Sequence, residues 1–217
     1  MTTNDILERI KQLTENGDDL RAEPLILQLL STHPDDPEIR LHYALLLSRL
    51  GRLNEALAQL KVLSKDYSQV PAVSINRADI LSRMGRHDEA VEVLTQFTER
   101  RPRFMQARFN LARALNHAGK LDEAISEYRL ALAHEPDHGE AWYRLGKVLL
   151  DDNRPDEAID CFSQALERLP DMCQPKVVQQ LRRAWKMQGH AVKESAPLWW
   201  RQPLSALFHG FVVNSKI

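Results

Sequence analysis

The stretch AWYRLGKVLLDDNRPDEAIDCFSQALERLP, residues 141–170, decides the fold of this chain. Apolar and small residues recur at helical spacing in its first half and again in its second half. The first set is Trp142, Leu145, Gly146 and Leu149, and the second is Ala158, Ile159, Phe162, Ala165 and Leu166. Asn153, which lies between the two sets, tolerates the positive φ that closes a helix C-terminus. The stretch therefore predicts a helix, a tight turn, a second helix and a linker.

The same pattern recurs along the chain with a period of 34 residues. Five alanines mark it: Ala22, Ala56, Ala90, Ala124 and Ala158. Glycines take the place of Asn153 in the other four copies: Gly17, Gly51, Gly85 and Gly119. The linker carries Pro34, Pro102, Pro136 and Pro170, with Ser68 in the remaining copy. Aspartates follow three of these prolines, at Asp35, Asp137 and Asp171, where they suit the start of the next helix. A fixed period of this length indicates a repeat array and not a single globule.

The quoted stretch and ARFNLARALNHAGKLDEAISEYRLALAHEP, residues 107–136, resemble tetratricopeptide repeats. The resemblance implies an all-α fold, a right-handed α-solenoid of helix-turn-helix units over residues 1–172. Its five units are 3–36, 37–70, 71–104, 105–138 and 139–172. The first unit diverges, with Ile10 at a small-residue position and Pro24 in its second helix, so we interpret it as an N-terminal cap. We predict a C-terminal capping helix over 173–189 and an aromatic tail over 190–217.

The composition excludes several classes of partner and compartment. The net charge is −1, so we expect no attraction to nucleic acid. The chain has two cysteines, too few for a disulfide framework, and Cys161 is expected to be a small buried residue. The N-terminal residues lack the apolar region of a secretory signal. We therefore expect a cytoplasmic protein, with a peripheral place at a membrane complex as the alternative.

One catalytic motif is present by its letters. Residues 134–138 read H-E-P-D-H, the H-E-x-x-H pattern of zinc proteases. That chemistry needs both histidines on one continuous helix, and Pro136 lies between them at the repeat's own linker position. The glycines are helix stops and form no phosphate loop. We therefore expect no metal site, no cofactor and no enzymatic activity.

In tetratricopeptide arrays the first helices of successive units line an inner groove, and the resemblance implies which positions face it. Carried over by phase, the partner-binding residues are Asn76, Arg83, Phe109, Asn110, Arg113, His117, Tyr143, Arg144 and Lys147. Two of them, Asn76 and Asn110, share one phase, and an amide can both donate to and accept from a peptide backbone. The cations favour a peptide or helix with acidic or carboxylate groups. The alternative is that these residues are only a solvated face.

The chaperone-tail carboxylate clamp of this family is incomplete in the sequence. Asn110 and Arg144 match two of its positions. Ile75, Asp79 and Glu140 stand where the resemblance requires a lysine, an asparagine and a lysine. Binding of heat-shock chaperone tails is therefore not predicted.

The tail holds adjacent tryptophans and further aromatic residues: Trp199, Trp200, Phe208 and Phe211. Three interpretations stay open, namely packing on the chain itself, docking to a partner or a second copy, and contact with a membrane interface. A bilayer span is not expected, because the apolar stretch 204–213 is about half of the ~20 residues needed to cross.

The sequence thus favours a non-catalytic adaptor or scaffold that binds another protein through its groove. One alternative is a chaperone-like assembly factor at a membrane complex, tethered by its tail. Another is a targeting subunit of an enzyme. The identity of the partner and the oligomeric state stay open.

Overall fold

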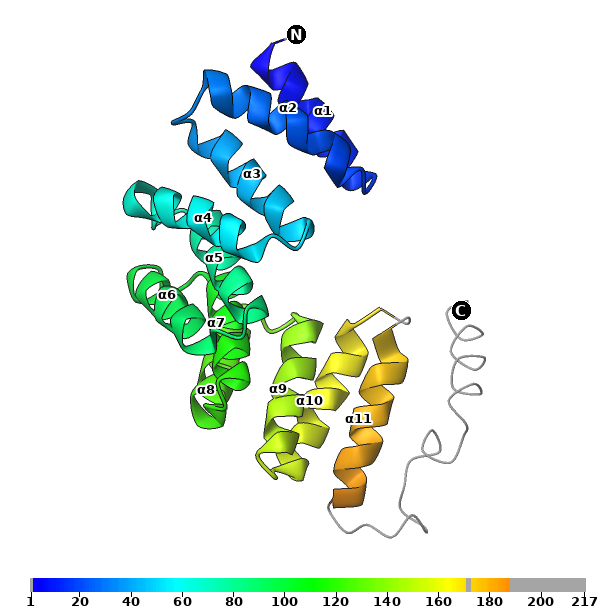
Figure 1. Cartoon of the computed structure of the whole chain (residues 1–217). Helices are drawn as coiled ribbons and strands as arrows, with labels where there is room; N and C mark the ends of the chain where they lie inside the picture. The colour runs from blue at the N-terminus through cyan, green and yellow to red at the C-terminus, as the bar shows by residue number, and fades with distance from the viewer. Residues whose placement is uncertain (1, 171–172, 188–217) are drawn as a thin grey trace. The chain divides into compact units, whose positions relative to one another are not determined.

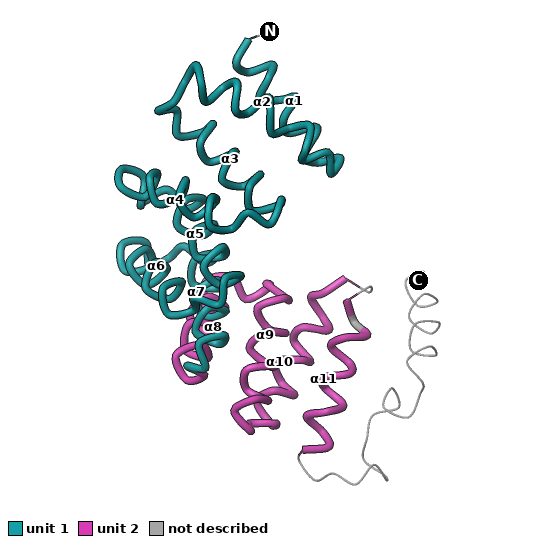
Figure 2. The backbone as a smooth tube through the Cα atoms, viewed as in Figure 1, with its two compact units in different colours: residues 1–120 teal, residues 121–217 magenta. Residues whose placement is uncertain are grey.

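The computed structural model describes residues 2–170 and 173–187 of the chain. These residues are all helical apart from turns and linkers, and no strand occurs among them (Figure 1). The chain divides into two compact units, residues 1–120 and 121–217, which Figure 2 shows in teal and magenta. The prediction of an all-helical array of helix pairs is confirmed.

The first unit contains seven helices in its described residues, and each packs against the next along the chain. They are α1 (Thr3–Glu15), α2 (Asp19–Thr32), α3 (Pro37–Arg49), α4 (Leu53–Tyr67), α5 (Pro71–Arg83), α6 (His87–Arg100) and α7 (Met105–His117). The first helices of neighbouring pairs also touch, because α3 contacts α5 and α5 contacts α7. These three first helices therefore lie side by side within this unit.

The second unit contains four helices in the described residues. They are α8 (Leu121–His134), α9 (Gly139–Asp151), α10 (Pro155–Arg168) and α11 (Gln174–Met187). Each packs against the next, and α9 also touches α11. The inner side of α11 is formed by Val177, Val178, Leu181 and Ala184, all buried.

The turn inside each pair has one geometry throughout the chain. Gly85 has φ +75°, its N–H donates to the Ser82 carbonyl at 3.0 Å, and the N–H of Arg86 donates to the Leu81 carbonyl at 2.9 Å. These two bonds form a Schellman motif, which satisfies the last carbonyls of the first helix. Asn153 adopts φ +58° in the equivalent turn. The predicted positive φ at the four glycines and Asn153 is confirmed.

The phased small residues lie where the two helices of a pair cross. All five phased alanines are fully buried. A Cβ built on Gly146 would lie 2.7 Å from Cε1 of Phe162, so only glycine fits at this crossing of α9 and α10. Burial of these small side chains lets the backbones approach closely, which is what the sequence pattern predicts.

The capping residues of α3 and α9 lie one position after the aspartates expected from the sequence. The expected capping residues are Asp35 and Asp137, directly after the linker prolines. In the structure Asp36 caps α3, accepting from the N–H groups of Glu38 at 2.9 Å and Ile39 at 3.1 Å. His138 caps α9 in the same way, because its Nδ1 accepts from Ala141 N–H at 3.0 Å. The aspartates after proline lie in the linker turn, and the third, Asp171, is outside the described residues.

Candidate protein-binding surface

The two phased asparagines adopt the same arrangement on α5 and α7. Asn76 Nδ2 donates to the Ala72 carbonyl, and Asn110 Nδ2 donates to the Gln106 carbonyl, each at 2.7 Å. Both bonds run one turn back along the same helix, so they fix the side-chain direction. Asn76 is half-buried, whereas Asn110 is 9% exposed. An amide held in this way still has a second N–H and a carbonyl oxygen to offer.

Two arginines of the predicted site connect neighbouring helix pairs of the first unit. Arg83 reaches from α5 to α3, where it donates to the Ser48 carbonyl at 3.0 Å and to the Ser48 hydroxyl. Arg113 reaches from α7 to α5 and pairs with Asp79 at 2.8 Å. Arg83 and Arg113, which the sequence predicts to bind a partner, therefore already interact with oxygen atoms of the chain itself.

The remaining predicted residues of α7 differ in their accessibility. Phe109 is only 7% exposed and packs inward. His117, at the end of α7, is exposed and stacks on His87 with ring centroids 5.4 Å apart. A partner on this surface would therefore contact the exposed imidazole of His117 more readily than the buried phenyl ring of Phe109.

In the second unit the predicted residues lie on α9. Tyr143 is half-buried, its ring centroid is 6.0 Å from that of Phe162, and burial raises the pKa of its hydroxyl. Arg144 donates from Nε to Glu140 Oε1 at 2.7 Å, one turn earlier. Lys147 follows Tyr143 by one turn, and within the described part of the chain no carboxylate forms an ion pair with it. Its ammonium is the cation of α9 that stays available to a partner.

The two acidic residues that depart from the carboxylate clamp have ion-pair partners in the chain. Asp79 holds Arg113, and Glu140 holds Arg144. The two residues that match the clamp belong to different units, Asn110 to the first and Arg144 to the second. Asp79 and Glu140 therefore form ion pairs within the chain itself.

The histidines of the H-E-x-x-H motif do not share a helix. His134 is the last residue of α8, and His138 is the N-cap of α9 with its Nδ1 occupied by a backbone N–H. The described residues contain no group of three or more histidine, cysteine or acidic side chains placed to hold a metal ion.

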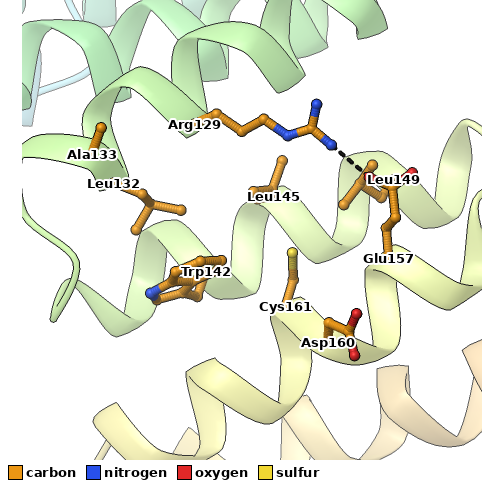
Figure 3. Close-up of a pocket in the computed structure, with 9 residues that line it drawn as sticks. All are labelled: Arg129, Leu132, Ala133, Trp142, Leu145, Leu149, Glu157, Asp160 and Cys161. Atoms are coloured by element: carbon orange, nitrogen blue, oxygen red, sulfur yellow. Dashed lines mark hydrogen bonds and ion pairs between the residues drawn. The ribbon is translucent and has the colours of Figure 1, made fainter.

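A cleft that the sequence did not predict opens between α8, α9 and α10 (Figure 3). Its volume is about 400 Å³, and it is lined by Arg129, Leu132, Ala133, Trp142, Leu145, Leu149, Glu157, Asp160 and Cys161. Cys161 is buried as expected, and burial raises the pKa of its thiol to about 12. The leucines and Trp142 carry the helical packing pattern, so no sequence signal separates a cleft from a filled core at these positions.

The predicted tail residues Trp199, Trp200, Phe208 and Phe211 lie outside the described residues, as do the last two residues of the predicted capping helix, 188–189. None of the helices described has the length and apolarity that a membrane crossing requires.

Comparison with known structures places the fold among helical repeat proteins. MamA 41-end from Desulfovibrio magneticus RS-1 matches with a TM-score of 0.67 and 17% identity, over 76% of this chain and 93% of that one. TTC0263, a thermophilic TPR protein in Thermus thermophilus, matches with a TM-score of 0.64 and 23% identity, over 86% of this chain and 99% of that one. A search of curated proteins found no match.

Two family models described as tetratricopeptide repeat match the sequence itself. One covers residues 75–135, and the other covers residues 13–80 and 117–184. The second alone spans more than half of the chain, in agreement with the helix pairs and their turns. The chain therefore belongs to the tetratricopeptide repeat family, a class of proteins that generally mediates protein–protein interactions.

Proposed function

We propose that this protein is a non-catalytic adaptor that binds a segment of another protein on the first-helix surface. We define that surface as two separate groups, the predicted residues of α5 and α7 in the first unit and those of α9 in the second. The observation that carries the proposal is the repeated asparagine arrangement. Asn76 and Asn110 are oriented by the same bond to the backbone four residues earlier, at 2.7 Å in both cases. Neither bond connects two helices, whereas a peptide backbone could use the remaining donor and acceptor of both amides.

The chemistry of this surface favours a particular kind of segment. A carboxamide supplies one donor and one acceptor, which matches an extended backbone without reading its side chains. On α9 the Lys147 ammonium lies one helical turn from the Tyr143 ring, with no ion-pair partner among the described residues. The pair suits a segment that carries a carboxylate beside an apolar group. The proposed partner is therefore a protein with an acidic peptide or helix.

The structure also decides which variants should test the site. Arg113 and Arg144 each hold a carboxylate of the same chain, so replacing them would release Asp79 and Glu140 as well. Lys147 and Asn76 can be changed with less disturbance, because Lys147 has no described ion pair and the Asn76 bond lies within one helix. The test variants are Lys147→Glu and Asn76→Ala in the full chain.

The experiment is quantitative capture from lysate with the full chain as bait, followed by mass spectrometry. The wild-type chain should retain a partner that Lys147→Glu and Asn76→Ala lose about 5- to 30-fold, since each removes an interaction of ~1–2 kcal/mol. The matched control is Lys61→Glu, which makes the same charge change at an exposed position of α4, a second helix. Equal loss in Lys61→Glu and Lys147→Glu would contradict the proposal, because it would indicate an effect of net charge alone.

A further inference from the structure

The cleft between α8, α9 and α10 has a floor that a large apolar side chain would fit. Leu132, Leu145 and Leu149 line it together with Trp142, whose indole N–H donates to the Pro136 carbonyl at 2.7 Å. This bond holds the ring at the edge of the opening (Figure 3). The volume of about 400 Å³ lies within the range of ~300–1,000 Å³ that is usual for ligand sites. The cleft is therefore large enough to accept aromatic side chains.

The rim of the cleft has one charge that the structure leaves uncompensated. Arg129 of α8 pairs with Glu157 of α10 at 2.5 Å, so these two charges balance across the opening. Asp160, one turn further along α10, is exposed and has no ion pair with any residue that the structure describes. An occupant that complements the cleft thus has apolar aromatic groups followed closely by a cation.

A segment of this chain has that chemistry. Trp199 and Trp200 are followed directly by Arg201. In residues 188–217 the charged side chains are Lys193, Arg201 and Lys216 against Glu194, three cations and one anion. The net positive charge of this segment is opposite in sign to the Asp160 carboxylate at the rim of the cleft.

The chain is also long enough to reach the cleft from the place where α11 ends. Arg183 Nη1 lies 3.9 Å from Asp151 Oδ1, so the last turns of α11 lie beside the turn between α9 and α10, where α10 begins. Cys161 is about 9 Å along α10 from that start, at ~1.5 Å per residue. Eleven residues lie between Met187 and Trp199, which makes twelve Cα–Cα steps. Extended, they could span at most about 40 Å, at ~3.3–3.6 Å per residue.

We propose that Trp199–Trp200–Arg201 of the same molecule occupies this cleft, with the indoles on the leucine floor and the Arg201 guanidinium beside the Asp160 carboxylate. This contact lies between α8, α9 and α10, and it involves none of the residues of the first-helix surface. It therefore stands or falls separately from the proposed function. A second copy's tail and an empty cleft are the competing outcomes.

The test is photo-crosslinking in the full chain with p-benzoylphenylalanine in place of Trp200. Irradiation should give an intramolecular crosslink to cleft residues such as Leu145, Leu149 or Cys161, located by peptide mass spectrometry. The same group placed at Phe211 is the positional control and should crosslink to these residues less. Crosslinks to α11 alone, or no crosslink at all, would overturn the proposal. A crosslinked dimer as the main product would overturn it in favour of the tail of a second copy.

The charge contact has its own readout in the same experiment. Asp160→Lys should lower the yield of the cleft crosslink about two- to fivefold, the range expected from an exposed ion pair. The matched control is Ser163→Lys, which adds a lysine at another exposed position of α10 that does not line the cleft. Combining Asp160→Arg with Arg201→Asp should restore the yield. An unchanged yield in Asp160→Lys, or no recovery in the exchanged pair, would contradict the assignment of Arg201.

Discussion

The turn of each helix pair depends on a single residue with positive φ. Gly85 at +75° and Asn153 at +58° occupy the same place in their Schellman motifs. Nothing lies within 4 Å of a Cβ built on Gly85, so a larger residue there meets no steric obstacle. The requirement is therefore purely one of backbone conformation, which glycine meets without strain and asparagine meets with little.

We predict opposite outcomes for two substitutions at these turns. Gly85→Ala should lower the free energy of unfolding by about 1 kcal/mol, because an L-residue is strained in the left-handed region. Asn153→Gly should leave it unchanged or raise it slightly. Guanidinium unfolding followed by circular dichroism measures both. A loss in Asn153→Gly as large as that in Gly85→Ala would show that the side chain and not φ decides this position.

Cys161 gives the chain a pH dependence of predictable sign. Burial, the largest cause, and the nearby Asp160 together raise the pKa of its thiol from 9.0 to about 12. Both states keep the proton below pH 9. Between pH 9 and 12 the unfolded chain loses it while the folded chain retains it, so unfolding becomes more favourable as the pH rises.

The expected result is a decline of wild-type stability over pH 9–12 that is steeper than that of Cys161→Ala. The measurement is the denaturation midpoint of both proteins at intervals of pH, with the difference between them as the quantity of interest. Groups common to both proteins cancel in this difference. A difference that stays constant from about pH 8 to 12 would contradict a buried, proton-retaining thiol.

For single residues, the sequence predicts the required backbone conformation better than it predicts the partner of a side chain. The positive-φ positions, the buried Cys161 and the need for a small residue at Gly146 all follow from phase, because phase determines which side of a helix faces its neighbour. The capping residues Asp36 and His138 were missed by one position, since Asp35 and Asp137 carry an equally suitable residue type. The partner of Arg113 was missed because phase does not specify which carboxylate a long side chain reaches.

Neighbouring helix pairs are connected by side chains that reach from one pair to the other. Arg113 of α7 reaches back to Asp79 of α5, which lies 34 residues earlier, one full period of the repeat. Their side chains are 30% and 40% exposed, so solvent screens the attraction. We therefore infer that this ion pair orients α7 on α5 and contributes little to the free energy of unfolding.

A double-mutant cycle of Arg113→Ala and Asp79→Ala tests this assessment. The coupling free energy should be about 0.2–1 kcal/mol and should shrink as salt is added. The control pair is Arg86 and Glu89, an exposed ion pair at i,i+3, whose coupling should be weak and should shrink with salt in the same way. A coupling above about 2 kcal/mol for Arg113 and Asp79 would mean that the pair is desolvated, contrary to its exposure in the structure.

Helix positions follow closely from the sequence, whereas the cleft does not. The apolar period predicts the order of helix, turn and helix in each repeat, because it directly reports the buried face. Trp142, Leu145 and Leu149 belong to that same face of α9, yet they line an opening next to α8 and α10. Whether facing side chains fill a space depends on the distance and angle between helices, and a pattern of residue types does not encode these.

In a repeat protein, the stability of each helix pair depends mainly on its own contacts and on those with adjacent pairs. Each helix of either unit packs mainly on its neighbours in the chain, so the stability of an array is approximately a sum of terms for single repeats and their interfaces. The resemblance implied a right-handed superhelix with an inner groove. The period alone identifies which repeats are neighbours, and the small rotation between one pair and the next depends on packing details beyond the period.

Hydrogen–deuterium exchange of the full chain, with and without the captured partner, tests the binding surface most directly. We expect slower exchange in peptides from α5, α7 and α9 when the partner is present. Peptides from the second helices α4, α6 and α10 should remain unchanged and serve as the internal control. Protection concentrated in those second helices, with α5, α7 and α9 unaffected, would contradict a binding site on the first-helix surface.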